Sequence, residues 1–177
     1  KAVAQTQGRV QLMQEVYGEW RQDKAREQAQ VLFKRYPAAR LVWSGNDLMA
    51  FGAMEAWCNQ GGRPGKDAFF SGVNTSSTAF QKLRSGELSA LAGGHFLAGA
   101  WSLVMLFDHF KGRDFASEGV ELERPMFKLF TAASSAQFER IWSAEPKPVN
   151  FKPFSKHHNP QLRHYDFDVE RLLQHAD

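Results

Sequence analysis

Apolar stretches of this chain stop abruptly at polar or aromatic residues in four places. If the stretches are parallel strands, these breaks are their carboxyl ends, which meet at one edge of a sheet. Open α/β sheets bind their ligands at that edge. The hydrophobic pattern therefore predicts a binding cleft before any single motif does. The four stretches are residues 11–17, 41–43, 69–70 and 88–92, and they end at Gly18-Glu19-Trp20, Ser44-Gly45-Asn46-Asp47, Ser71-Gly72-Val73-Asn74-Thr75 and Gly93-Gly94-His95.

Strands and helices alternate along residues 1–112 with short connections. Apolar residues recur at helical spacing, as in Ala25, Ala29, Leu32 and Phe33, and Pro37 ends that helix. Such alternation is typical of a three-layer, doubly wound parallel sheet with right-handed crossovers, so the predicted fold class is α/β. The predicted strands are residues 10–17, 41–43, 67–73 and 88–92, the second of them buried, and the predicted helices are 23–36, 47–60, 76–84 and 95–110.

Residues 113–177 follow a different pattern. A strand at 126–130 and a helix at 134–142 are predicted, and prolines then interrupt the chain at 146, 148, 153 and 160. We expect an extended tail on the surface of the domain, closed by a short helix at 169–175. The apolar stretch within helix 95–110 runs to about twelve residues, short of the roughly 20 that span a bilayer, so it predicts a buried or interface helix.

Composition narrows the function classes. The 177 residues are 43% hydrophobic and 23% charged, which is ordinary for a globular protein. The 22 basic and 19 acidic residues are mixed along the chain, so no basic face for nucleic acid is indicated. A single cysteine, Cys58, excludes an intrachain disulfide. Its place beside Trp57 in a predicted helix favours a buried small residue over an activated thiol.

Polar residues at the strand ends form the candidate site. Asn46 and Asn74 each offer an acceptor oxygen and two donor hydrogens. Trp20 offers an aromatic face that can pack on the apolar face of a sugar ring. Amides with one aromatic suit a neutral, polyhydroxylated ligand. Structural roles stay open. Asn46 or Asp47 can cap the helix that starts there, Asn74, Thr75 or Ser76 can cap the next one, and Trp20 can be a core residue.

Residue patterns for a metal, phosphate-binding or catalytic site are weaker than the pattern at the strand ends. His157, His158 and His164 lie close together but lack the ligand spacing of zinc sites, which favours a solvated basic stretch. The glycine-rich residues 61–66 follow a helix instead of opening one, unlike a phosphate-binding loop. No nucleophile elbow or pair of acid–base carboxylates stands out. The sequence thus predicts a binding protein that is not an enzyme and needs no metal or cofactor.

Three segments in combination are specific to one family. The pattern is Asn-Asp-x-x-Ala-x-Gly, then Gly-Lys-Asp, a strand and Gly-x-(Asp/Asn). It resembles the type I periplasmic sugar-binding proteins of ABC transporters, whose relatives include the effector domains of LacI-type repressors. The resemblance covers about residues 8–112. The segments are residues 42–53 (Val-Trp-Ser-Gly-Asn-Asp-Leu-Met-Ala-Phe-Gly-Ala), Gly65-Lys66-Asp67 with Gly72-Val73-Asn74, and residues 83–88 (Leu-Arg-Ser-Gly-Glu-Leu).

The resemblance implies roles for individual residues. Trp20 matches the aromatic that stacks on the ligand, and Asn46 matches a ligand-binding amide. Asn74 stands where ribose-type binders carry an Asp that binds sugar hydroxyls, so the resemblance does not fix the sugar. The ligand-contacting Gln of the family's hinge strand corresponds to Gly94 here. We expect either that His95, the next residue, replaces that contact or that the contact is lost.

The resemblance also implies two lobes that close on a ligand between them. Residues 1–94 and about 126–177 would form the C-terminal ligand-binding lobe. Residues 95–125 would hold a hinge crossing and a helix that packs on an N-terminal lobe. Helix 95–110 is therefore expected to be buried by that lobe or by another chain. Residues 1–8 read as the end of a helix closed by Gly8, so we expect the sequence to be part of a longer protein.

The implied function is that of a solute-binding protein. It would bind a sugar or sugar-like molecule in the periplasm for uptake by an ABC transporter, with a permease or a membrane sensor as its protein partner and no nucleic-acid partner. The alternative within the same fold is a ligand-sensing ectodomain or a repressor effector domain.

Overall fold

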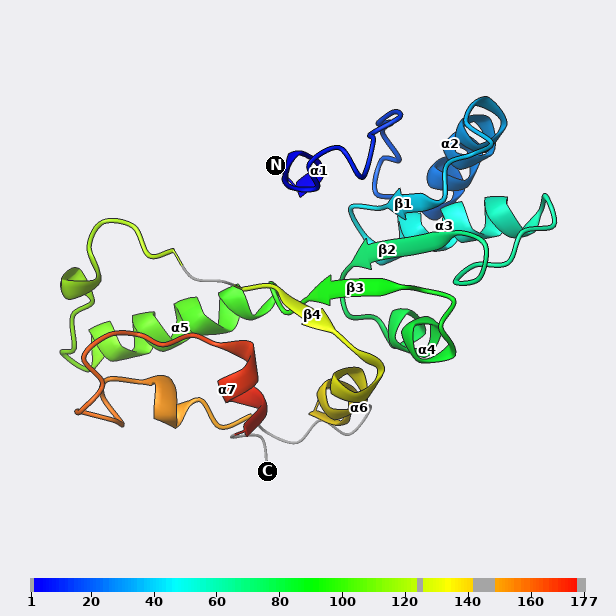
Figure 1. The fold of residues 1–177 in the computed structure, drawn as a ribbon. Helices are drawn as coiled ribbons and strands as arrows, with labels where there is room; N and C mark the ends of the chain where they lie inside the picture. The colour runs from blue at the N-terminus through cyan, green and yellow to red at the C-terminus, as the bar shows by residue number, and fades with distance from the viewer. Residues whose placement is uncertain (1, 124–125, 142–148, 175–177) are drawn as a thin grey trace. The chain divides into compact units, whose positions relative to one another are not determined.

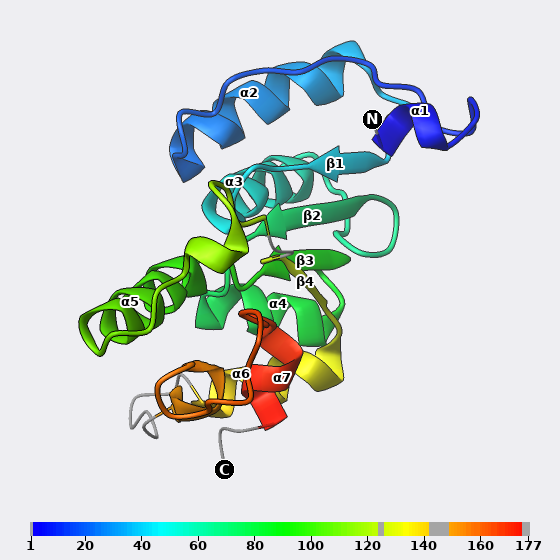
Figure 2. The same cartoon turned by 90° about the vertical axis from the view of Figure 1, so that its left-hand side faces the viewer.

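The structure is a computed structural model that describes residues 2–123, 126–141 and 149–174. The chain divides into two compact units, residues 1–91 and residues 92–177, and each is described by itself (Figures 1 and 2). The four strands hydrogen-bond in the order β1-β2-β3-β4. They are β1 (Leu41–Trp43), β2 (Phe69–Val73), β3 (Ala90–Gly93) and β4 (Lys128–Phe130).

The first unit alternates strands and helices, as predicted. It contains α1 (Ala2–Gln5), α2 (Gln22–Arg35), α3 (Asp47–Cys58) and α4 (Ser77–Ser85). Strands β1 and β2 are parallel, with Leu41 opposite Phe69 and Trp43 opposite Ser71. The predicted α/β class is confirmed, and the predicted strands and helices after residue 20 are present with ends shifted by one or two residues.

Helix α3 is the centre of the first unit because nearly all of its faces are buried. Helix α2 packs closely against it at Gly52, where a Cβ atom would lie 2.1 Å from the backbone oxygen of Gln22. A side chain at position 52 would therefore push the two helices apart. Beneath them, the ring of Phe33 meets Trp57 edge-on at 4.9 Å and Phe70 at 6.5 Å between centroids.

Three predictions about the first unit are wrong. The predicted strand at residues 10–17 is absent, and Tyr17 is 94% exposed, because no neighbouring strand in the described chain takes up the backbone groups of this segment. Strand β1 is not buried: it is the first strand in the sheet order, and Leu41 and Trp43 are 61% and 75% exposed. Cys58, the last residue of α3, is exposed and not buried.

The second unit holds the remaining elements. They are α5 (Leu97–Phe110), η1 (Ala116–Glu118), β4, α6 (Ala132–Ile141), η2 (Lys152–Phe154) and α7 (Val169–Gln174). The predicted strand at 126–130 and the helices at 134–142 and 169–175 are confirmed, although residues 142 and 175 lie outside the described residues. None of the described helices is long and apolar enough to cross a membrane.

The tail covers one face of α5. Trp101 is 1% exposed, and Phe167 stacks on it at 4.9 Å with an interplanar angle of 10°. Phe154 and Phe151 approach the same ring to 4.9 and 5.3 Å between centroids. One face of helix α5 is thus buried by the tail of its own chain. Burial of the opposite face by another lobe or another chain stays a prediction. That face carries the exposed residues Leu103, Leu106 and Phe110.

Candidate functional site

A strained turn presents Trp20 at the edge of the first unit. The N–H of Arg21 donates to the oxygen of Gly18 at 2.9 Å and closes the turn. Glu19 and Trp20 both have positive φ, +52° and +58°, as in a type I′ turn, where Gly, Asn and Asp are usual. A left-handed conformation costs a residue with a side chain about 1–2 kcal/mol. Strain of this kind clusters at binding sites, where surrounding contacts maintain it.

Two contacts maintain this turn. Asn46 Nδ2 donates to the backbone oxygen of Trp20 at 3.2 Å. The indole ring lies over Gly45, where a Cβ atom would be 3.2 Å from Cζ3 of Trp20. The ring remains 68% exposed, so Trp20 is not a core residue. The turn therefore offers a fixed aromatic surface to a ligand.

Asn46 has a structural role as well. Its Oδ1 accepts from the N–H of Met49 at 2.8 Å, so Asn46 is the N-cap of α3. The capping role left open by the sequence is thus real. With Nδ2 bonded to Trp20, the same side chain joins the start of α3 to the turn. One N–H of Nδ2 and one lone pair of Oδ1 are left for a ligand.

Asn74 follows directly after β2. Its backbone φ is +128°, a conformation that favours glycine, and its side chain is exposed. Its Nδ2 lies 3.5 Å from Oδ1 of Asp47. Asp47 in turn accepts from Oγ of Ser76 at 2.5 Å, and Ser76 is the N-cap of α4. The structure therefore links Trp20 to Asn46, and Asn74 to the residue next to Asn46.

Sequence reasoning missed the importance of Asp47 and Ser76 in this arrangement. Both appeared only as candidate helix caps, and Asp47 is 2% exposed. The available signal was an acidic residue at the start of the predicted helix 47–60, close behind the end of a strand, where a carboxylate that becomes buried needs partners.

His95 lies in the second unit, just before α5. Its ring stacks on Phe127 at 5.0 Å between centroids, with an interplanar angle of 28°. Its Nδ1 is buried and has no hydrogen-bond partner among the described residues. A ligand contact for His95 stays a prediction.

Arg21, directly after the turn, forms an ion pair with Asp23. Arg21 donates to both carboxylate oxygens of Asp23, from Nε at 3.0 Å and from Nη2 at 2.6 Å. These hydrogen bonds lower the pKa of Asp23 to about 2. Arg21, next to the Trp20 surface, is therefore already paired with Asp23 within its own segment.

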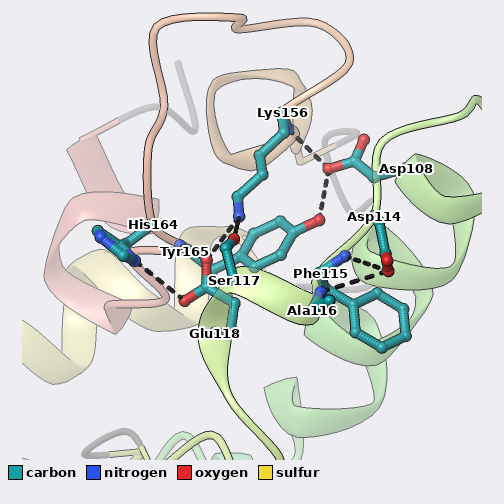
Figure 3. Close-up of polar contacts among 9 residues, drawn as sticks. All are labelled: Asp108, Asp114, Phe115, Ala116, Ser117, Glu118, Lys156, His164 and Tyr165. Carbon is teal, nitrogen blue, oxygen red and sulfur yellow. Dashed lines mark hydrogen bonds and ion pairs between the residues drawn. The ribbon is translucent and has the colours of Figure 1, made fainter.

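A second polar cluster lies in the second unit (Figure 3). Asp108 of α5 is fully buried and accepts four hydrogen bonds from the tail. Its Oδ1 accepts from Ser155 Oγ at 2.5 Å and from the N–H of His157 at 3.2 Å. Its Oδ2 accepts from the N–H of Lys156 at 2.6 Å and from the hydroxyl of Tyr165 at 2.9 Å. These bonds fasten the tail to α5.

A buried ion pair adjoins this carboxylate. Lys156 Nζ lies 2.6 Å from Oε1 of Glu118, and the two side chains are 9% and 2% exposed. Burial opposes ionisation of Glu118, but hydrogen bonds from Lys156 Nζ and the N–H of Tyr165 outweigh it and keep its pKa below the usual value. Burial, with the hydrogen bond to Asp108, raises the pKa of Tyr165. Since the carboxylates are occupied by protein donors, we assign this cluster a structural role.

The tail histidines pack against aromatic and acidic neighbours. His158 stacks on Phe107 at 5.4 Å, with an interplanar angle of 9°, and His157 meets the same ring edge-on at 5.6 Å. Nδ1 of His164 lies 3.7 Å from Oε2 of Glu118. Within the described residues, no group of three or more His, Cys, Asp or Glu side chains is arranged to hold a metal ion.

Comparisons with known proteins agree with this architecture. A family model described as periplasmic binding protein domain matches residues 1–114. The crystal structure of a periplasmic sugar-binding protein from Pseudomonas fluorescens is 42% identical, with a TM-score of 0.87. The alignment covers 97% of this chain and 52% of that one. No curated protein matches this chain.

More distant structures share the fold. A galactofuranose binding protein is 18% identical with a TM-score of 0.64, over 77% of this chain and 46% of that one. The periplasmic binding protein component of the arabinose ABC transporter from Shewanella sp. ANA-3 is 20% identical with a TM-score of 0.60, over 89% and 48%. The chain thus spans about half the length of the structures that it matches.

The family resemblance found in the sequence is therefore confirmed. The family model covers more than half of the chain, and the relative from Pseudomonas fluorescens matches almost all of it, including the tail. This chain belongs to the periplasmic binding protein family.

Proposed function

We propose that this chain supplies one wall of a binding site for a sugar or sugar-like molecule, and that the complete protein is a periplasmic solute-binding protein of an ABC importer. Trp20 would stack on the apolar face of the sugar ring, and Asn46 and Asn74 would bond its hydroxyls. The observation that carries the proposal is the strained turn of Glu19 and Trp20, held by Asn46. The indole is left 68% exposed on a left-handed backbone that Trp does not favour.

The comparisons support this proposal. The 42% identical relative is described as a periplasmic sugar-binding protein, and it aligns with the tail as well as with the first unit. A shared tail favours the transport function over a repressor effector domain. The partner would be the membrane permease of the importer.

The mechanism we propose is closure of two lobes on the ligand. A sugar held against Trp20 and Asn74 would also contact a second lobe, so that binding favours the closed arrangement over the open one. His95 is proposed as a contact that approaches the ligand from the hinge. The proposed assignment of residues 1–94 and about 126–177 to one lobe, with 95–125 at the hinge, follows the family pattern.

A thermal-shift screen of the complete protein tests the proposal. The panel would contain neutral monosaccharides, sugar acids, amino acids and nucleosides at equal concentration. A ligand at one hundred times its Kd stabilises the folded protein by about 2.7 kcal/mol, which is easily detected. We expect the largest shift in melting temperature from a monosaccharide. A protein stabilised by amino acids or nucleosides and by no sugar would refute the proposed function.

A further inference from the structure

The side chain of Met49 packs against the turn that carries Trp20. Met49 is the third residue of α3 and is half-buried. A Cβ atom at Gly18, the first residue of the turn, would lie 2.6 Å from Sδ of Met49, and a Cβ atom at Gly45 would lie 3.1 Å from its Cε. The thioether therefore contacts the backbone of the turn and also the segment that follows β1.

Two glycines leave room for this side chain. Neither Gly18 nor Gly45 has a positive φ, so the backbone conformation does not require glycine at either position. The available space does, because a Cβ atom at Gly45 would also lie 3.2 Å from Cζ3 of Trp20. Met49 and the indole ring thus approach the same glycine, and a methyl group at that position would press on both of them.

A strained turn depends on contacts of this kind. Glu19 and Trp20 are both in the left-handed region, so the turn relaxes unless its surroundings hold it. Asn46 supplies a hydrogen bond to the backbone oxygen of Trp20, and Met49 supplies packing. The N–H of Met49 also donates to Oδ1 of Asn46 at 2.8 Å. Replacement of Met49 by alanine keeps that N–H and removes the packing alone.

We propose that Met49 is a positioning residue for Trp20, whose thioether holds the turn so that the indole ring lies over Gly45. Methionine suits this place because its unbranched, polarisable side chain fills irregular gaps and makes favourable contacts with aromatic rings. Without it the space between Gly18 and Gly45 is empty, and the strained turn can relax into that space. The ring would then lose its fixed place before any sugar binds. This inference rests on the proposed function, and it gives Met49 an effect on sugar binding that acts only through Trp20.

Fluorine NMR of the sugar-free complete protein, labelled with fluorotryptophan, tests whether Met49 fixes the ring. The resonance of Trp20 is assigned by its loss in Trp20→Ala. We expect Met49→Ala to move this resonance toward the position of free fluorotryptophan. The matched control is Met13→Ala, because Met13 is a 46% exposed methionine in the segment before the turn, and it should leave the resonance in place. An unmoved Trp20 resonance in a folded Met49→Ala protein overturns the inference, whether or not a sugar binds.

A double-mutant cycle tests whether Met49 acts on binding through Trp20. The probe is whichever of D-galactose, D-glucose, D-ribose and L-arabinose raises the melting temperature of the complete protein most. Calorimetric titration gives its Kd for the wild type, Met49→Ala, Trp20→Ala and the double variant. We expect Met49→Ala to weaken binding at least about threefold when Trp20 is present, and less than about 1.5-fold in the Trp20→Ala protein. Met13→Ala should keep the wild-type Kd.

Each outcome decides the inference. Equal weakening by Met49→Ala with and without Trp20 shows a merely structural Met49 and overturns it, as does an unchanged Kd; both leave the proposed function standing. If Met49→Ala does not fold, Gly45→Ala replaces it with the same expected results, because the added methyl group would press on the ring. If none of the four sugars binds to the wild-type protein, the role of Met49 in sugar binding fails, whereas the proposed function is judged by the wider screen.

Discussion

The change of Asp108 to Asn in the second unit should destabilise the protein by about 2–4 kcal/mol. Each oxygen of Asp108 accepts one backbone N–H and one hydroxyl. Asparagine replaces one oxygen by an NH₂ group. The hydroxyl at that position can turn and accept, but the backbone N–H is left buried against another donor. That loss costs about 1–3 kcal/mol, and the remaining bonds weaken because the acceptor is no longer charged.

Equilibrium unfolding in urea, followed by tryptophan fluorescence, measures this effect. Trp101 packs beside the tail and reports on the same region. The matched control is Asp114→Asn, because Asp114 is an exposed residue that accepts from the N–H groups of Phe115 and Ala116. Asparagine can keep those bonds, so the control should change stability by less than about 0.5 kcal/mol. An Asp108→Asn protein as stable as the control would refute the role assigned to this cluster.

Two further predictions concern stability. The pKa of Glu118 is held below its ordinary value of 4.5, so ionised Glu118 should add to the free energy of unfolding above that pH and lose this effect as the pH falls further. Urea titrations at several pH values should show this dependence, and Glu118→Gln should flatten it. Gly52→Ala should destabilise the protein by about 1–3 kcal/mol, because the added Cβ atom would meet the backbone of Gln22. In Gly99→Ala of α5 the added Cβ atom has no other atom within 4 Å, so this variant should stabilise the protein slightly in the same assay. Equal effects of Gly52→Ala and Gly99→Ala would contradict the close packing of α2 on α3.

Local patterns were sufficient to predict most of the helices and strands. The helical spacing of Ala29 and Phe33 matches the residues of α2 that are buried. The predicted strand at residues 10–17 shows the limit of this reasoning, since alternation makes a strand only where another strand pairs with it. Pairing is a tertiary property, as is the exposure of β1 at the first place in the sheet order.

The candidate site was partly predictable. The ends of the apolar stretches led to Trp20, Asn46 and Asn74, and the structure joins these residues through a turn and a buried carboxylate. The left-handed backbone of Glu19 and Trp20 could not be predicted, because neither residue type favours that conformation. Nor could the bond between Asp108 and Tyr165, whose partners are 57 positions apart in the sequence.

The most direct test of the central claim is calorimetric titration of Trp20→Ala with the sugar that most stabilises the complete protein. Loss of the stacked ring should weaken binding at least about tenfold, or about 1.4 kcal/mol. Phe69→Ala is the control, because Phe69 is an exposed aromatic at the start of β2, whereas Asn74 follows the end of that strand. The account predicts weak binding by the first variant and wild-type binding by the second. A folded Trp20→Ala protein with unchanged affinity would contradict it.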